Sequence, residues 1–172
     1  MLDLLSDIWR PSQVVVGDKI IEYVVSDVDG VLTDGGYYCD AQGLQFKKFH
    51  CNDSVALRLM AKAGLSIVLV TSASEESFQI TARRVKGIPN LKLLHCAFGS
   101  KYEDARHEVV FRRAVVIGDC VDDIPMLKAA GLSFCPADAI DEVKLHAGVL
   151  KRRGGEGCLL EVAMCLGLGI DA

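Results

Sequence analysis

Short apolar runs alternate with segments of helical periodicity along most of the chain, and this alternation restricts the possible folds more than any other feature. The runs are rich in β-branched residues and apolar almost throughout, which is typical of strands buried on both faces of a parallel sheet. Helices that connect such strands must cover both faces. The sequence therefore predicts an α/β fold with a doubly wound, mostly parallel sheet, organised as one domain over residues 1–172.

The expected elements follow from the positions of turn and cap residues. Strands are expected at residues 20–25, 66–70, 91–96, 114–117 and 132–135. Helices are expected at residues 53–63, 75–86, 101–110, 123–130, 139–146 and 158–166, and a short amphipathic helix at residues 2–9, ended by Pro11. Asn52 or Asp53 is the expected cap of the first long helix. Two short strands, at 37–40 and 44–50, predict a β-hairpin inserted at about residues 36–50, with no large cap domain, and a C-terminal tail spans about 151–172.

Composition excludes several functional classes. The formal net charge of −4 and the pI near 5.5 make nonspecific nucleic-acid binding a poor hypothesis. No run approaches the roughly 18 apolar residues of a membrane helix, and the N-terminus lacks the pattern of a signal peptide. Seven cysteines, an odd number without a C-x-x-C pair, predict a reducing cytoplasmic location without a disulfide framework or zinc site.

Polar and charged residues follow the strands where these end. In chain order they are Asp27 and Asp29, Thr71 and Ser72, Lys101, and Asp119, Asp122 and Asp123. The carboxyl ends of parallel strands lie at one edge of a sheet, where the active sites of doubly wound folds are found. We therefore expect these side chains to form one site.

These residue types suit phosphoryl transfer. An ionised Asp27 is able to attack phosphorus, and Asp29, two residues later on the same side of an extended segment, is able to protonate a leaving alcohol and then activate water. Lys101 and Thr71 suit the phosphoryl oxygens. Asp27 and Asp119 offer the carboxylate oxygens that Mg²⁺ prefers.

Each of these residues also has an ordinary structural explanation. A D-x-D pair is common, and loop aspartates often cap helices or shape turns. Thr71 suits a cap for helix 75–86, and Lys101 suits a solvated helix position. The joint occurrence of all of them at strand ends, in this order, favours the catalytic interpretation.

The same residues form four motifs in order. They are D-x-D-G at 27–30, a threonine at 71, a lysine at 101, and G-D-x-x-x-D at 118–123. Together they resemble the haloacid dehalogenase superfamily. Over about residues 21–166 the chain is most similar to the capless branch that contains 3-deoxy-D-manno-octulosonate 8-phosphate phosphatase and the phosphatase-like C-terminal domain of animal CMP-sialic acid synthetases. The resemblance implies that Asp27 is the nucleophile and Asp29 the general acid and base, while Thr71 and Lys101 hold the phosphoryl group.

The resemblance also implies a cofactor, a substrate class and an assembly. Mg²⁺ would be bound by Asp27, the backbone carbonyl of Asp29 and Asp119, with Asp123 in support. The substrate would be a phosphorylated 3-deoxy-2-keto sugar acid, of the octulosonate or nonulosonate 8- or 9-phosphate type. The octulosonate phosphatases are tetramers, so a homotetramer is expected.

Four departures from the branch pattern affect the substrate more than the reaction. Ser72-Ala73 stands where octulosonate phosphatases carry Gly-Arg, and Asn52-Asp53-Ser54 replaces an R-D-G element. Cys120 replaces the second aspartate of G-D-D, and Glu156 replaces the arginine of G-G-R-G. A non-catalytic oligomerisation or binding module of the same fold therefore stays open as an alternative. A phosphomutase or phosphonatase would require a larger cap.

The predicted hairpin is too apolar for an isolated two-stranded ribbon. Its apolar residues are Tyr37, Tyr38, Leu44, Phe46 and Phe49. We expect hairpins of several subunits to pack together and cover neighbouring sites; folding back onto its own domain is the alternative. Arg152 and Arg153 in the tail are candidate substrate ligands that would replace the arginine missing beside Thr71, together with Ser72.

Overall fold

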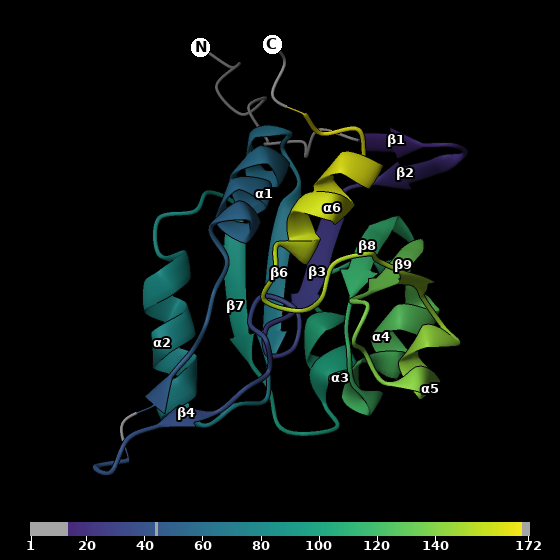
Figure 1. The fold of residues 1–172 in the computed structure, drawn as a ribbon. Helices are drawn as coiled ribbons and strands as arrows, with labels where there is room; N and C mark the ends of the chain where they lie inside the picture. Colours follow the sequence, from purple (N-terminus) through teal and green to yellow (C-terminus); the bar gives the residue numbers. More distant parts are fainter. Residues whose placement is uncertain (1–13, 44, 170–172) are drawn as a thin grey trace, which may run out of the picture.

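The computed structural model describes residues 14–43 and 45–169, and its main sheet has the predicted α/β arrangement (Figure 1). Six parallel strands form it in the order β10-β9-β8-β3-β6-β7. They are β3 (Tyr23–Asp27), β6 (Ser66–Thr71), β7 (Leu91–His95), β8 (Ala114–Ile117), β9 (Leu132–Cys135) and β10 (Gly148–Val149). The described residues contain no large cap domain, as expected.

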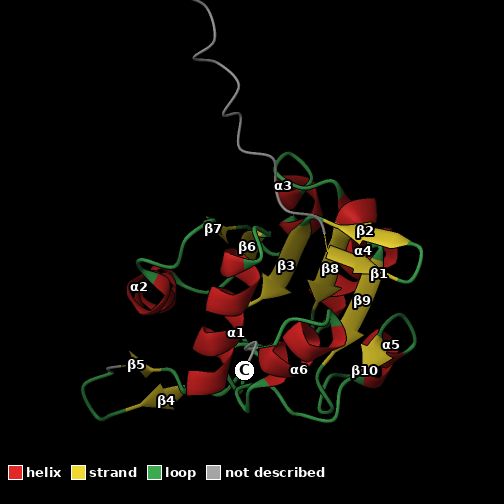
Figure 2. Cartoon of the chain, turned by 90° about the horizontal axis from the view of Figure 1, so that it is seen from above, coloured by secondary structure: helices red, strands yellow, loops and turns green. Residues whose placement is uncertain are grey.

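Helices cover both faces of this sheet (Figure 2). They are α1 (Cys51–Lys62), α2 (Glu75–Val85), α3 (Lys101–Ala105), α4 (Ile124–Ala129), α5 (Asp141–Lys144) and α6 (Cys158–Cys165), with 3₁₀ turns η1 (Phe111–Arg113) and η2 (Val121–Asp123). Alternate residues of the central strand β3 enter opposite cores: Val24 packs with residues of α1 and α6, and Val25 with residues of α3 and α4. This alternation explains why the strand is apolar on both sides.

The order of the strands determines where a site can form. From β3 the chain continues to β6 and β7 on one side, and then returns to β8 on the other side of β3. The carboxyl ends of β3, β6 and β8 therefore lie next to one another, with Asp27 paired with Val70 and Ser26 with Ile117. Such a reversal of strand order leaves a crevice at the carboxyl ends of the strands.

The start of the chain differs from the expectation. The predicted strand 20–25 is divided at Glu22 into β2 (Lys19–Ile21) and β3, and β2 pairs with β1 (Val14–Val16) through a turn at Gly17. The Glu22 carboxylate accepts a hydrogen bond from the Arg113 side chain, and the Glu22 backbone is hydrogen-bonded to neighbouring segments. The chain therefore leaves one sheet and enters the other at this point. The predicted helix at residues 2–9 and its end at Pro11 lie outside the described residues.

The cap of α1 is also different. The helix begins two residues earlier than predicted, and His50 caps it: its Nδ1 accepts a hydrogen bond from the Asn52 N–H. Asp53 instead is buried and accepts a hydrogen bond from the N–H of Leu159 in α6, at 2.9 Å. The predicted cap at Asn52 or Asp53 is therefore wrong, and His50 is the cap.

Several predicted elements are shorter than expected. The hairpin strands are only β4 (Tyr38–Cys39) and β5 (Gln45–Phe46). Helix α3 ends at Ala105 instead of residue 110, because the chain turns there and buries Val109 and Phe111. Strand β10 was not predicted. No helix among the described residues is long and apolar enough to cross a membrane.

Candidate active site

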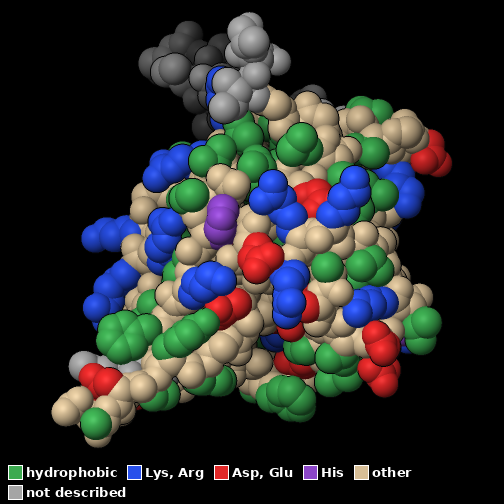
Figure 3. All heavy atoms as spheres, viewed as in Figure 1, with side chains coloured by type: hydrophobic (Ala, Val, Ile, Leu, Met, Phe, Trp, Pro, Cys, Tyr) green, Lys and Arg blue, Asp and Glu red, His purple; other side chains and the backbone are tan. Residues whose placement is uncertain are grey.

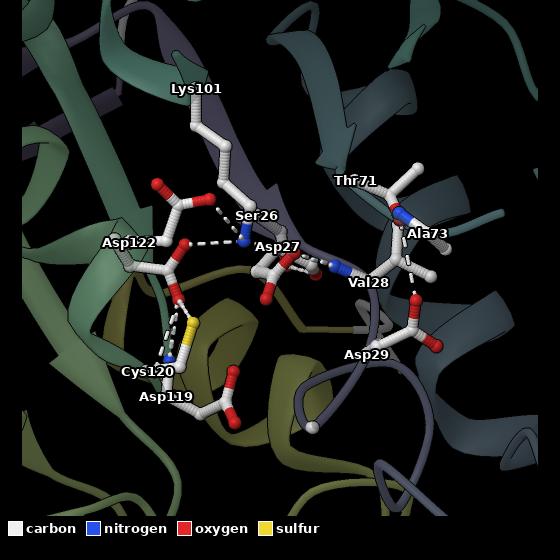
Figure 4. A network of polar contacts seen from close by, with 12 residues as sticks. Ser26, Asp27, Val28, Asp29, Thr71, Ala73, Lys101, Asp119, Cys120 and Asp122 are labelled. Carbon is white, nitrogen blue, oxygen red and sulfur yellow. Dashed lines mark hydrogen bonds and ion pairs between the residues drawn. The ribbon is translucent and has the colours of Figure 1, made fainter. Parts of the chain in front are cut away.

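Asp27 is the last residue of β3 and lies at the centre of the site (Figure 4). Its side chain is almost fully buried, and Oδ1 accepts a hydrogen bond from the Val28 N–H at 2.8 Å. The same oxygen is 2.9 Å from Nζ of Lys101. Burial, together with the nearby carboxylate of Asp123, raises the pKa of Asp27 well above its ordinary value. A carboxylate here needs cationic neighbours to stay ionised.

Lys101 supplies one such cation from the first turn of α3. Its side chain is 2% exposed, and Nζ donates to Asp123 Oδ1 at 2.9 Å as well as pairing with Asp27. A third carboxylate, that of Asp122, has an oxygen 3.9 Å away. Burial alone would lower the pKa of Lys101, but Asp27 and Asp123 raise it above its ordinary value. The lysine is therefore charged and compensates the carboxylates around it.

The loop after β8 places Asp119 and Asp123. Asp123 Oδ2 accepts hydrogen bonds from the N–H groups of Asp119 at 2.9 Å and Cys120 at 3.2 Å, and from the Cys120 thiol at 3.5 Å. A Cβ on Gly118 would lie 2.4 Å from Cβ of Asp123, so only glycine fits there. Both oxygens of Asp123 are thus engaged, and its carboxylate shapes the loop that presents Asp119.

The residues of this cluster fit a hard divalent cation. Ligand atoms of Asp27, Asp119, Cys120 and Asp123 all lie within 4.8 Å of one another. Oδ1 of Asp119 is buried and has no hydrogen-bond partner among the described residues. Burial and Asp123 raise the pKa of Asp119 to about 6. Converging carboxylates, one of which has a buried oxygen without a partner, are the ligands that a divalent cation would bind.

Asp29 lies in a second cluster beside the first. Its carboxylate accepts hydrogen bonds from the hydroxyls of Thr33 at 3.2 Å and Thr71 at 3.3 Å. Lys47, from the segment after β5, reaches the same carboxylate with Nζ 2.8 Å from Oδ1 and 3.0 Å from Oδ2. The Thr71 hydroxyl also accepts a hydrogen bond from the Ala73 N–H at 3.2 Å, and this bond fixes the loop after β6. Asp29 is therefore fixed by three side chains of different segments.

A cavity of roughly 150 Å³ lies between the two clusters. Its lining residues are Asp27, Asp29, Tyr37, Thr71, Ser72, Ala73, Lys101 and Cys120. Five residues singled out in the sequence thus share one cavity, since Asp27, Asp29, Thr71, Ser72 and Lys101 all line it. The volume of this cavity is large enough to hold a phosphoryl group.

Arg152 and Arg153 do not line that cavity. Arg152 donates to the backbone carbonyl of Glu156 at 3.1 Å, and Arg153 pairs with Asp138 at 3.2 Å. The neighbouring glycines do reach the site: a Cβ on Gly154 would lie 2.0 Å from the carbonyl oxygen of Gly30. The tail thus packs against the loop after Asp29 through its backbone and not through its arginines.

Lys47 and Thr33 were missed in the sequence. Lys47 lies between Phe46 and Lys48, which are both exposed. Nothing in its spacing distinguishes it from Lys48, and only the path of the hairpin brings it to Asp29. Thr33 follows Asp29 by four residues, in the segment directly after the D-x-D-G motif, and this closeness in sequence is the signal that would have found it.

Comparisons with known proteins agree with this fold. The family model of haloacid dehalogenase-like hydrolases matches residues 105–152. The 3-deoxy-D-manno-octulosonate 8-phosphate phosphatase KdsC of Haemophilus influenzae is 32% identical over 150 residues, covering 83% of this chain and 81% of that protein. The KdsC of Yersinia pestis is 27% identical over 159 residues, covering 88% of this chain and 82% of that protein.

A solved structure extends the comparison. The cobalt-bound deoxy-D-mannose-octulosonate 8-phosphate phosphatase of Haemophilus influenzae matches with a TM-score of 0.72 at 30% identity, covering 86% of this chain and 88% of that one. The fold is a doubly wound α/β sheet with an acidic site at its strand ends, and the chain belongs to the haloacid dehalogenase-like hydrolases. Within that family it is a KdsC-like phosphatase.

Proposed function

We propose that this protein is a Mg²⁺-dependent phosphatase that hydrolyses a phosphorylated 3-deoxy-2-keto sugar acid through an aspartyl-phosphate on Asp27. The observation that carries the proposal is the shared cavity, which is lined both by a buried carboxylate beside Lys101 and by a second carboxylate held by Thr71. Asp27, Asp119 and the backbone of Asp29 would hold the metal, with Asp123 in support. When bound, Mg²⁺ keeps the carboxylates ionised and neutralises charge on the phosphoryl oxygens.

In the first half of the reaction, a carboxylate oxygen of Asp27 forms a bond to phosphorus while the ester P–O bond breaks. The electron pair of that bond leaves with the alcohol oxygen. Asp29 gives its proton to this oxygen, so the product leaves as a neutral alcohol. Lys101 and Thr71 hold the phosphoryl oxygens as charge develops on them.

In the second half, a water molecule attacks the phosphorus of the aspartyl-phosphate. Asp29, now ionised, takes a proton from this water, and the bond between phosphorus and the Asp27 oxygen breaks. Inorganic phosphate is released and the carboxylate of Asp27 is restored. Each group ends in its starting state, so the cycle balances.

The substrate class is inferred from the relatives, since several of them are octulosonate 8-phosphate phosphatases. Ser72-Ala73 leaves the cavity without an arginine on the loop after β6, and Tyr37 lines the same cavity. We expect a substrate of the octulosonate or nonulosonate type with a different contact to its acid group. The alternative of a non-catalytic module is not favoured by any feature of the site, whose residues keep their mutual contacts.

A substrate panel tests the proposal. Octulosonate 8-phosphate, nonulosonate 9-phosphate and neutral sugar phosphates are assayed with Mg²⁺ and after exhaustive chelation. We expect the fastest turnover on a 3-deoxy-2-keto acid, loss of activity with the chelator and its return with Mg²⁺. Absence of turnover on every ester, or full activity after chelation, would overturn the proposal.

A further inference from the structure

Lys47 is a lysine whose side chain is turned inward. It follows strand β5 of the hairpin, and its side chain is only 6% exposed, while the side chain of the adjacent Lys48 is 52% exposed. Successive side chains of an extended segment point to opposite sides, so the hairpin presents one lysine to the protein and the other to solvent. Figure 3 shows the outer surface of this hairpin, with hydrophobic and basic side chains side by side at the lower left.

The buried ammonium has three polar partners. Nζ lies 2.8 Å and 3.0 Å from the two carboxylate oxygens of Asp29, and 3.3 Å from Oγ1 of Thr81 in α2. An ammonium has three N–H donors, so this set satisfies it. Thr81 is fully buried and its hydroxyl donates to the Ser77 carbonyl at 3.3 Å, which leaves its lone pairs for Lys47. The surroundings of Lys47 are therefore built for a cation.

Anchoring the hairpin does not require this arrangement. A buried ion pair contributes little net stability, because removing both charges from water costs about as much as their attraction returns. An apolar side chain would attach the hairpin to α2 equally well. What only the ammonium provides is a fixed, charge-compensated position for the carboxylate of Asp29.

We propose that Lys47 is a positioning residue for the proton transfers of Asp29; this inference rests on the proposed function. Thr33 and Thr71 each hold one oxygen of the carboxylate, and Lys47 bridges both, so the plane of the group is fixed toward the cavity. The ammonium also balances the charge that Asp29 carries after it has given its proton to the leaving alcohol. Removal of Lys47 leaves the carboxylate held by two hydroxyl hydrogen bonds alone, at 3.2 and 3.3 Å, which restrain its plane less than the bridging ammonium does.

The test uses two esters that differ in their need for a proton. An alkyl phosphate requires protonation of its leaving oxygen, whereas p-nitrophenyl phosphate releases a stable phenolate without it. Lys47→Met keeps the length of the side chain and removes its charge. Hydrolysis of the aspartyl-phosphate is common to the two esters, so the rate to measure is that of the first half-reaction, the release of the alcohol in a single turnover. We expect this rate to fall about 10²-fold on the alkyl phosphate that wild type hydrolyses fastest, with the single-turnover release of p-nitrophenolate within about 3-fold of wild type.

Controls separate this role from a structural one. Lys48→Met, one residue along the hairpin, should leave both rates within about 2-fold of wild type. Asp29→Asn should show the same selective loss in stronger form. If Lys47→Met does not fold, Thr81→Val removes one partner of the ammonium in a nearly isosteric way and should lower the alkyl-ester rate about 3- to 10-fold, again selectively.

Equal loss on the two esters in the folded Lys47 variant, or no loss on either, would overturn the inference. A wild-type protein that hydrolyses neither ester, or an Asp29→Asn variant without the selective loss, would instead overturn the proposed function on which it rests. The two failures are thus distinguishable in one set of rate measurements.

Discussion

At the scale of single residues, the site is a balance of buried charges. Asp27, Asp119 and Asp123 converge, and Lys101 is the cation that pairs with Asp27 and Asp123. One ammonium does not neutralise three carboxylates, and burial together with the charge of Asp123 raises the pKa values of Asp27 and Asp119. The balance predicts how stability of the metal-free protein depends on pH.

Asp119 should make the metal-free protein less stable as the pH rises. Burial and Asp123 raise its pKa from 3.8 to about 6, so the folded state binds its proton more tightly than the unfolded state. The stability that this provides is complete below about pH 4 and is lost as the pH rises through about 6. We expect the melting temperature to fall by about 2–8 °C more between pH 4.5 and pH 7 in wild type than in Asp119→Asn, both after chelation.

Asp53 provides an internal comparison for that experiment. Its pKa is also raised to about 6 by burial, but it lies under α6 and outside the acidic cluster. The part of the pH dependence that Asp53 contributes should therefore survive in Asp119→Asn and be insensitive to Mg²⁺, whereas the part removed by the substitution should also disappear when Mg²⁺ is added to wild type. Identical pH profiles for the two metal-free proteins would contradict the role of Asp119.

At the scale of elements, the loop after β3 and the C-terminal tail fit together through glycines. Gly154 is buried and packs against the carbonyl of Gly30, directly after Asp29. Gly155 N–H donates to the carbonyl of Val31 at 3.0 Å. The loop that carries Asp29 is thus supported by residues more than 120 positions later in the chain.

Gly154→Ala should disturb this support. The new Cβ would lie 2.0 Å from the Gly30 oxygen, and backbone on both sides leaves it little room to relax. We expect a loss of about 1–3 kcal/mol in the free energy of unfolding and a lower kcat/KM. Gly169→Ala is the matched control, because nothing lies within 4 Å of the Cβ position there. Thermal melting and steady-state rates check the pair, and a fully stable, fully active Gly154→Ala would contradict this packing.

The sequence predicted the sheet, its strand ends and the residues that follow them, because buried parallel strands and their polar ends are local signals. It did not predict Lys47 at Asp29 or Asp53 at the start of α6. Both contacts join residues whose proximity depends on the completed fold: Asp53 and Leu159 lie 106 positions apart. The break at Glu22 was missed for the same reason, since its partner Arg113 belongs to another segment.

At the scale of the whole molecule, the hairpin projects from the fold (Figure 1). Phe49 packs at the edge of the core and Lys47 enters the site, so part of the hairpin contacts its own domain. Tyr37, Tyr38 and Phe46 are nevertheless exposed. Contact with other subunits therefore stays a prediction for these three side chains.

Light scattering tests this prediction. We expect a mass near four chains for wild type, and a lower mass together with lower activity for Phe46→Asp, because a charge in an apolar contact is strongly destabilising. Val15→Asp is the control: Val15 is also an exposed apolar strand residue, but in β1, at the opposite end of the molecule from β4 (Figure 1). A fully active wild-type monomer at assay concentration would contradict the assembly.

The most direct test of the proposed chemistry is chemical trapping of the aspartyl-phosphate. Enzyme mixed with Mg²⁺ and its best substrate is quenched in acid during turnover, and the acyl phosphate is reduced with borohydride, which converts a phosphorylated aspartate to homoserine. Peptide mass spectrometry should find homoserine at position 27, and only at that position. Asp27→Asn should yield none and should lose about 10³-fold or more of its activity while keeping its melting temperature within a few degrees of wild type. Turnover without any trapped acyl phosphate, or homoserine at another aspartate, would contradict Asp27 as the nucleophile.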